Sequence, residues 1–490
     1  MIIHKKLTNS HLGLSGHRTR GNRSQAFSVA KCMVPPHPAV VAEIKRELDK
    51  AKKEDPQLNV IEYLKTLGIE PGYNPLGKDD PSRPKTGALM EGRIELERID
   101  VPSFKPTGDI NALVILIDFD DNVATTPLEH YSEMLFSKNT YLTGSLRDYY
   151  DTVSKGRVNI VGVVSGWHRM PEKYSYYVGN GSGGDENGYP HNAKRMVEDA
   201  VSLTLEKDKS IKWNDYDLNG DGMVDALFVV HAGPGAEVKG TPAERAKHIW
   251  SHKWTVQNPI QVTDKTSVAL YLTVPEDGLL GVYAHEAGHL IFGWPDLYDA
   301  CPGPDRTAGI GEWSLMASGS WNNGGLTPSY PDGWCRYVQG WSKPTIIQAD
   351  QKIDTTRIED SDQVYVLPIK GKTKEYFLFE CRSRVKYDKF LPGEGMLVYH
   401  IDEGAENNCD ENHLAVGLVQ ADGQQNLERI GLLSNQGDDG DPFPGSSGRN
   451  HLNASGFPNS LDYNGKDTGI SITDIAWDGK RLTANASDKS

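Results

Sequence analysis

The run His285-Glu286-Ala287-Gly288-His289 constrains this chain more than any other feature of its sequence. Residues four apart lie one turn above each other on a helix, so both histidine side chains can reach the same metal ion. Flanking apolar residues at mixed three- and four-residue spacing favour such a helix, and Gly293 followed by Pro295 predicts where it ends. The sequence therefore predicts a helix that presents two metal ligands.

The residue types in this run suit a zinc hydrolase. Zn²⁺ lowers the pKa of a bound water towards neutrality, and a neighbouring carboxylate can take its proton and later pass it to a leaving amine. We therefore expect His285 and His289 to bind Zn²⁺ and Glu286 to act as general base and then general acid on a zinc-bound water. The alternative is a pair of surface or core histidines on an ordinary amphipathic helix, as for most isolated pairs at this spacing.

A catalytic zinc usually has three protein ligands, so another is expected near this helix. Asp296 and Asp299 follow Gly293, where the chain can turn sharply back towards the metal. We favour Asp296 as the third ligand and keep Asp299 in reserve, although either carboxylate could cap a turn instead. Met316 lies among small residues some thirty positions after the helix, where a methionine can form a hydrophobic floor beneath a metal site.

Alternating oxygen-bearing side chains predict a second metal site. Ca²⁺ takes six to eight oxygen ligands, and short acidic and amide side chains at alternate positions can supply them. No acid stands at the twelfth place of this loop, which disfavours an EF-hand. An Asx-rich turn without metal is the alternative. The predicted calcium ligands are Asp215, Asp217, Asn219, Asp221 and Asp225, and the run 437–441 is a weaker candidate.

Length and charge limit the classes of protein open to this chain. At 490 residues it is long enough for about three domains, and its formal net charge of −15 opposes nucleic-acid binding as its main function. The longest apolar runs, such as 112–117, have the length of strands, so we expect no membrane span. Residues 1–30 lack the apolar region of a signal peptide. Five cysteines permit two disulfides and one free thiol but establish none.

Periodicity and turn signals divide the chain into four segments. An arm without acidic residues precedes a charged, helical pre-segment that ends in a linker rich in Pro, Gly and Asp. Short apolar strands then alternate with helices, which predicts an α/β catalytic domain, and later strand-like runs predict a β-sandwich-like domain. The segments are 1–30 (arm), 31–107 (pre-segment, with helices at 39–53 and 60–67), 108–342 (catalytic) and 343–490 (β-rich).

The zinc run, the segment 293–299 and the methionine segment 313–321 together resemble the immune inhibitor A type of secreted bacterial zinc metallopeptidases. The resemblance extends to the runs 145–150, 228–237, 249–252 and 441–445. It implies a metzincin-like fold with an acidic third ligand, a secreted zymogen, bound calcium and endopeptidase activity on proteins. One departure stands out, because three residues separate His289 from Gly293 where the family pattern has two. The extra residue leaves open which aspartate completes the zinc site.

Cys32 lies ahead of the pre-segment helices and is a candidate for control of the site. A thiolate is a strong zinc ligand, so this residue could take the position of the water and hold the enzyme latent. A disulfide or an inert thiol is the alternative. His231, His248 and His252 either line the cleft or are polar residues of the core. No residue stands out as the group that stabilises the oxyanion.

The sequence thus predicts a monomeric, secreted zinc endopeptidase that acts on proteins or peptides, with no nucleic-acid partner. A different class remains possible, namely a catalytically inactive binding protein that acts through its C-terminal β-domain. A second enzymatic alternative is the hydrolysis of a non-peptide amide.

Overall fold

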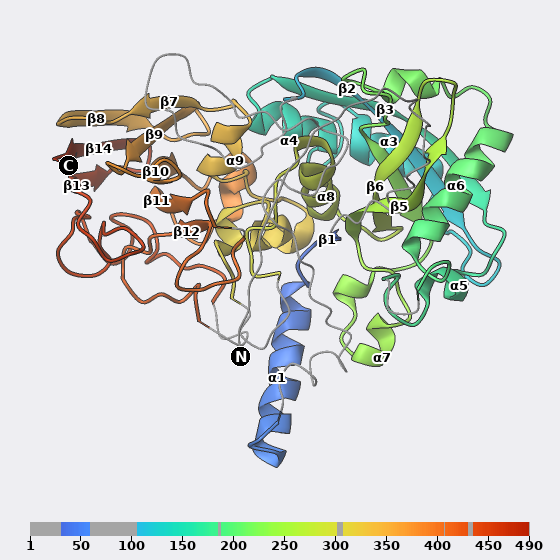
Figure 1. Ribbon diagram of the computed structural model, residues 1–490, viewed down its shortest axis with the longest axis horizontal. Helices are drawn as coiled ribbons and strands as arrows, with labels where there is room; N and C mark the ends of the chain where they lie inside the picture. Colours follow the sequence, from blue (N-terminus) through green and yellow to red (C-terminus); the bar gives the residue numbers. More distant parts are fainter. Residues whose placement is uncertain are drawn as a thin grey trace, which may run out of the picture.

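The computed structural model describes residues 31–58, 105–184, 188–300, 307–405, 407–429 and 435–489. Within them, a short N-terminal segment is followed by an α/β part and then by a β-rich part that lies beside it (Figure 1). The predicted arm at 1–30 and the predicted helix at 60–67 fall outside the described residues. In the described residues, no helix combines the length and the apolar character of a membrane span.

A six-stranded mixed sheet forms the centre of the α/β part, in the strand order β1-β5-β6-β4-β2-β3. Strands β3, β2, β4 and β6 run parallel, whereas β5 is antiparallel to β6 and β1 is antiparallel to β5. The edge strand β1 comes from the pre-segment. The strands are β1 (Cys32–Met33), β2 (Gly108–Asp118), β3 (Val158–Arg169), β4 (Leu227–His231), β5 (His252–Gln261) and β6 (Ser267–Pro275).

Helices cover both faces of this sheet, because successive residues of a buried strand point to opposite sides. Along β2, Val114 belongs to the core beneath α3, α4 and α8, whereas Leu113 and Ile115 belong to the core beneath α5 and α6. The helices are α1 (Pro38–Glu54), α3 (Leu128–Phe136), α4 (Leu146–Val153), α5 (Tyr174–Val178), α6 (Ala193–Lys207), α7 (Pro242–Arg245), α8 (Leu280–Phe292) and α9 (Gly333–Val338). Short 3₁₀ turns are η1 (Trp213–Tyr216), η2 (Ala236–Val238), η3 (Gly311–Trp313), η4 (Ser318–Gly325) and η5 (Lys386–Phe390).

The C-terminal part contains a five-stranded sheet in the order β12-β11-β10-β9-β7 and a three-stranded sheet in the order β13-β14-β8. On β10, Tyr376 and Leu378 join the core shared with the α/β part, whereas Phe377 and Phe379 pack in the core shared with the three-stranded sheet. The larger sheet is therefore the middle layer. The strands are β7 (Lys343–Ile346), β8 (Gln351–Thr356), β9 (Gln363–Pro368), β10 (Glu375–Arg382), β11 (Gly395–Asp402), β12 (Val416–Leu418), β13 (Ile470–Trp477) and β14 (Arg481–Asp488).

Most predicted elements of the two larger parts are confirmed. The expected strands at 112–119, 158–164 and 226–230 are β2, β3 and β4, and the C-terminal part is rich in strands. The pairing of β1 with β5 was not predicted, because β1 has two residues and carries no periodicity of its own. The metzincin-like arrangement and the domain boundaries stay predictions.

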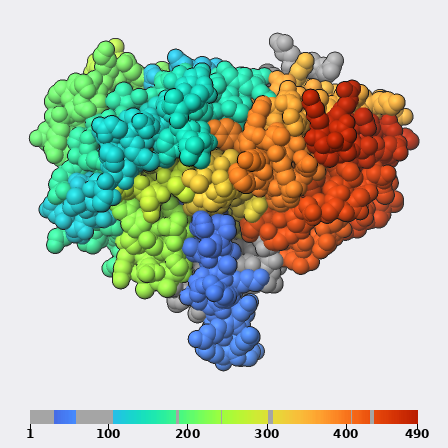
Figure 2. All heavy atoms as spheres, turned by 180° about the vertical axis from the view of Figure 1, so that it is seen from behind, coloured from blue at the N-terminus to red at the C-terminus, as the bar shows by residue number. Residues whose placement is uncertain are grey.

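The pre-segment enters the α/β part at β1 and leaves it as helix α1. The imidazole Nδ1 of His37 accepts the N–H of Ala39, and Pro38 occupies the first turn, where a missing N–H does no harm. From there α1 projects away from the body of the molecule (Figures 1 and 2). The contacts that seat this segment on the sheet are therefore concentrated before the helix.

Candidate metal centre

Helix α8 carries the zinc run in the middle of the α/β part, and all 13 of its residues are buried. The helix ends as predicted at Gly293, which adopts the left-handed conformation at φ 66° and donates its N–H to the carbonyls of Gly288 and His289. Because the chain reverses there, the residues after Gly293 return to the helix face that carries the two histidines.

Three ligand-type atoms converge on this face. His285 Nε2 and His289 Nε2 lie 3.0 Å apart, and Asp296 Oδ1 lies 3.1 Å from the first and 3.0 Å from the second. All three side chains are almost completely shielded from solvent. Bonds of about 2.0–2.1 Å in a tetrahedral zinc site place neighbouring ligand atoms about 3.3 Å apart. The triangle is therefore close to the size that one zinc ion requires.

Backbone carbonyls orient both imidazoles. His285 Nδ1 lies 2.8 Å from the carbonyl of Leu315, and His289 Nδ1 lies 2.6 Å from the carbonyl of Trp294. Since a carbonyl only accepts, each Nδ1 carries the hydrogen and each Nε2 presents a lone pair to the centre of the triangle. Burial lowers the pKa of His285, which favours its neutral form. Without a cation, two lone pairs and a carboxylate would face one another at close range.

Glu286 lies beside this triangle in a fully buried position. Burial, followed by the charge of Asp296, raises its pKa well above the usual range, and the N–H groups of Val34 and Lys253 lower it by less. Neither N–H makes a hydrogen bond of normal geometry to Glu286, so within the described residues both oxygens of this carboxylate lack such a partner. A buried carboxylate in this condition calls for a polar group or a positive charge nearby.

Met316 packs beneath the same helix. A Cβ atom placed on Gly288 would lie only 2.6 Å from Met316 Sδ, so the helix and the methionine are in direct contact. The backbone carbonyl of Met316 also accepts the N–H of Leu297, one residue after Asp296. The segment thus supports the histidine helix from below and fixes the chain that brings Asp296 to the site.

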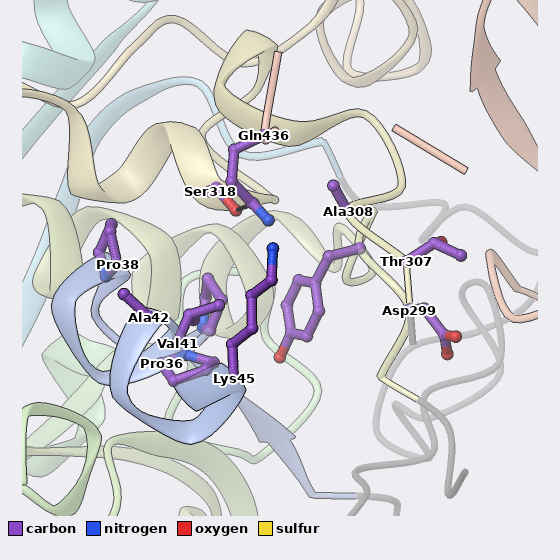
Figure 3. Close-up of a pocket in the computed structure, with 12 residues that line it drawn as sticks. Pro36, Pro38, Val41, Ala42, Lys45, Asp299, Thr307, Ala308, Ser318 and Gln436 are labelled. Carbon is purple, nitrogen blue, oxygen red and sulfur yellow. Dashed lines mark hydrogen bonds between the residues drawn. The ribbon is translucent and has the colours of Figure 1, made fainter. Parts of the chain in front are cut away.

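Asp299 does not join the triangle. It lines a cavity of about 270 Å³ between α1 and the α/β part, together with Lys45 and Ser318. Figure 3 shows Asp299 at the far end of this cavity from Pro38. The return of the chain after Gly293 therefore brings Asp296, and not Asp299, to the histidines.

Cys32 is the residue that the structure adds to this group. Its sulfur, a ligand atom of His289 and a ligand atom of Asp296 all lie within 4.8 Å of one another. Cys32, Cys335 and Cys381 form no disulfide, and the last two are buried elsewhere in the fold, whereas Cys409 is disulfide-bonded. Three cysteines outside disulfides leave room for at most one disulfide within the chain, fewer than the composition allows.

The predicted calcium loop begins inside η1, at Asp215, and folds around two of its own carboxylates. Asp217 accepts the N–H groups of Gly220, Asp221 and Gly222 at 2.8, 3.1 and 2.9 Å. Asp225 Oδ2 accepts the N–H of Leu218 at 2.7 Å. These bonds give the loop a defined shape with oxygen-bearing side chains along it, and calcium binding stays a prediction.

Two of the three other histidines are polar residues of the core. His231 and His252 are completely buried, and His252 Nε2 lies 3.2 Å from the hydroxyl of Tyr271. Burial lowers the pKa of His231 to about 4 and that of His252 well below its usual range. His248 is only partly buried, and burial lowers its pKa as well.

Two histidines, an aspartate and an adjacent buried glutamate are the residue types that a metallopeptidase site requires. The comparison with known families agrees, because residues 109–346 match the family described as immune inhibitor A peptidase M6, catalytic domain. Residues 109–346 are thus similar to the catalytic domain of that family, which confirms the resemblance expected from the sequence.

Named relatives support the same assignment. The chain is 31% identical over 272 residues to Immune inhibitor A of Bacillus thuringiensis subsp. alesti. The aligned region is 45% of this chain and 39% of that protein. It is also 32% identical over 276 residues to Pre-pro-metalloprotease PrtV of Vibrio cholerae serotype O1. This aligned region is 46% of this chain and 29% of that protein. The chain thus matches well under half the length of these relatives.

Proposed function

We propose that the chain is a zinc-dependent endopeptidase in which His285, His289 and Asp296 hold Zn²⁺ and Glu286 transfers the proton. The observation that carries the proposal is the triangle of Nε2, Nε2 and Oδ1 atoms with sides of 3.0–3.1 Å beside a fully buried glutamate. Zinc, when bound, supplies a Lewis acid that makes an attacking water acidic at neutral pH.

Glu286 then acts as the base and afterwards as the acid. Its carboxylate takes the proton of the attacking water and delivers it to the nitrogen of the departing amine. Positive charge at the triangle opposes the effect of Asp296, so the raised pKa of Glu286 would fall into a range where it can both accept and release a proton. Met316 holds the helix that carries this glutamate.

The pairing of the pre-segment with β5 supports the assignment of peptides as substrates. Its residues Cys32 and Met33 lie as an extended strand against the edge of β5. Backbone pairing of this kind recognises a peptide main chain without needing a chain end, which suits cleavage within proteins. A protein or peptide is therefore the substrate class we assign.

The remaining features follow the relatives. A pre-pro-metalloprotease is among them, which supports a secreted zymogen, and we infer a monomer. We also infer that the loop Asp215–Asp225 binds Ca²⁺ and stabilises the α/β part. Calcium should raise the Tm of the chain but leave the Tm of an Asp217→Ala variant unchanged; equal effects on both would contradict the calcium loop.

Casein hydrolysis tests the proposal directly. We expect the chain, after cleavage between residues 58 and 105, to degrade casein in a manner that a zinc chelator stops and added zinc restores. A zinc-loaded, cleaved and folded chain that turns over no protein would support instead a binding protein acting through its β-rich part. Hydrolysis of small amides without any peptide cleavage would favour the other alternative.

A further inference from the structure

We propose that Cys32 is the fourth ligand of the zinc held by His285, His289 and Asp296, and that this bond keeps the full chain inactive. The inference rests on the proposed function, because it requires the zinc site, and it adds how that site is regulated. The structure favours this role over the disulfide that the sequence leaves open for Cys32, since Cys32 forms no disulfide and its sulfur lies near ligand atoms of His289 and Asp296.

The thiol lies near two of the three ligand atoms, on a triangle that can take a fourth ligand. The three other ligand atoms form a nearly equilateral triangle, which leaves one corner open. A zinc–sulfur bond of about 2.3 Å beside zinc–nitrogen bonds of about 2.0–2.1 Å places sulfur about 3.5 Å from its neighbours. Cys32 is fully buried and its sulfur lies within 4.8 Å of atoms of His289 and Asp296, so the sulfur must move closer to the ligand atoms, His285 Nε2 included, when it binds the metal.

Strand pairing holds Cys32 in this place. Cys32 pairs with Lys253 and Met33 pairs with His252 on the antiparallel edge of β5. Successive side chains of a strand point to opposite sides, so turning Cys32 towards the metal turns Met33 away from it. A strand of two residues is too short to be stable by itself, which means that other contacts must fix it.

Three aromatic side chains provide those contacts by binding three successive carbonyls of the pre-segment. The Tyr298 hydroxyl donates to the carbonyl of Met33, and the indole N–H groups of Trp250 and Trp321 donate to the carbonyls of Val34 and Pro35 at 2.8 and 2.7 Å. These donors come from separate segments of the α/β part. The three donors thus fix the backbone that directly follows Cys32.

The same segment also covers the catalytic glutamate. The N–H of Val34 lies near the carboxylate of Glu286 without forming a hydrogen bond of normal geometry to it. Both oxygens of Glu286 are buried without a normal hydrogen bond among the described residues, so the glutamate faces the space that the pre-segment closes. Residues 32–34 therefore close the open metal position and screen the base together. Release requires the thiolate to take up a proton and leave the metal.

Cobalt substitution of the full chain tests the zinc–sulfur bond. With Co²⁺ in place of zinc, we expect a thiolate-to-cobalt absorption band that Cys32→Ser abolishes while one cobalt per chain remains bound. The matched control is Cys381→Ser, another buried free thiol, which should keep the band. We also expect Cys32→Ser to raise casein hydrolysis by the uncleaved chain about tenfold or more.

A labelling experiment on the unmodified chain guards against a variant that fails to fold. In mild urea a maleimide should label Cys32 faster after zinc is chelated, because the zinc–sulfur bond no longer holds the pre-segment, whereas the labelling of Cys335, which is equally buried, should change less. One bound cobalt without a thiolate band, or equal labelling of Cys32 with and without zinc, would overturn the role of Cys32 and leave the proposed peptidase intact. A full chain that binds no metal, and no protein turnover after cleavage, would overturn both.

Discussion

Asp296 Oδ1 lies 3.0 Å from His289 Nε2, although the helix that carries His289 continues for three further residues before it ends at Gly293. The left-handed conformation of Gly293 reverses the chain, and the bond from Leu297 N–H to the Met316 carbonyl anchors it next to Asp296. An additional helical residue before the turn is thus compatible with an aspartate ligand at this position.

Asp296→Asn should remove most of the zinc and the activity together. The amide keeps the shape of the side chain but loses the negative charge, and we expect zinc affinity to fall by more than about 100-fold, since loss of a group that only orients a ligand costs 10–100-fold. Metal analysis after dialysis and casein hydrolysis measure the two effects. Asp299→Asn is the control and should keep its zinc; the reverse pattern would assign the ligand role to Asp299.

Zinc removal should lower thermal stability as well as activity. Two imidazole lone pairs and a carboxylate meet at 3.0–3.1 Å, and the cation that offsets their repulsion binds only the folded chain. Zinc at 100 times its Kd contributes about 2.7 kcal/mol, which corresponds to about 5–10 °C in Tm for a domain of this size. Calorimetry with and without a chelator measures this change in Tm. A His285→Ala variant whose Tm falls as much on chelation as that of the unaltered chain would contradict the site.

Gly288→Ala should destabilise the protein even though alanine is the better helix former. The added Cβ would lie 2.6 Å from Met316 Sδ, and crowding of this kind costs about 1–3 kcal/mol against a gain of about 1 kcal/mol in helix propensity. In a Met316→Ala background this contact is gone and Trp294 Cε3, at 3.2 Å, stays close to the added Cβ, so the same change should cost clearly less. Urea unfolding of the four proteins tests this, and equal effects in both backgrounds would show that the contact is unimportant.

Stability should decrease as the pH falls from 7 to 5. Burial lowers the pKa of His231 to about 4 in the folded chain, whereas the same imidazole in the unfolded chain has a pKa near 6.5. Between these values only the unfolded chain takes up the proton. The folded state is therefore progressively destabilised as the pH falls from about 6.5 towards 4. For this one imidazole the loss between pH 7 and 5 is about 2 kcal/mol. His231→Gln should reduce the dependence by that amount, measured by urea unfolding at both pH values. His451→Gln removes an exposed imidazole and should leave the pH dependence of stability unchanged.

The sequence predicts the local parts of this structure well and the long-range parts poorly. The helix, its end at Gly293 and the candidate metal ligands all follow from short-range spacing and turn chemistry. The carbonyls of Leu315 and Trp294 that orient the imidazoles carry no side-chain signal, because every residue has a carbonyl. The contact of Cys32 with the site depends on a pairing between residues more than 200 positions apart, which no local pattern encodes.

The aromatic donors to the pre-segment illustrate the same limit. Trp250 and Trp321 look like ordinary core residues in the sequence, and both are indeed mostly buried. Their indole N–H groups become informative only when the fold brings them to the carbonyls of Val34 and Pro35. A buried tryptophan needs a partner for its N–H, so the sequence can indicate that one exists but not where it lies.

Casein hydrolysis by a Glu286→Gln variant of the cleaved chain is the most direct test of the central claim. The amide preserves the size of the buried side chain but cannot accept the proton of the attacking water. We predict that this variant binds one zinc, keeps its fold and loses at least about 100-fold in hydrolysis rate, the smallest contribution expected of a general base. A folded, zinc-loaded Glu286→Gln variant that hydrolyses casein at the unaltered rate would contradict the account.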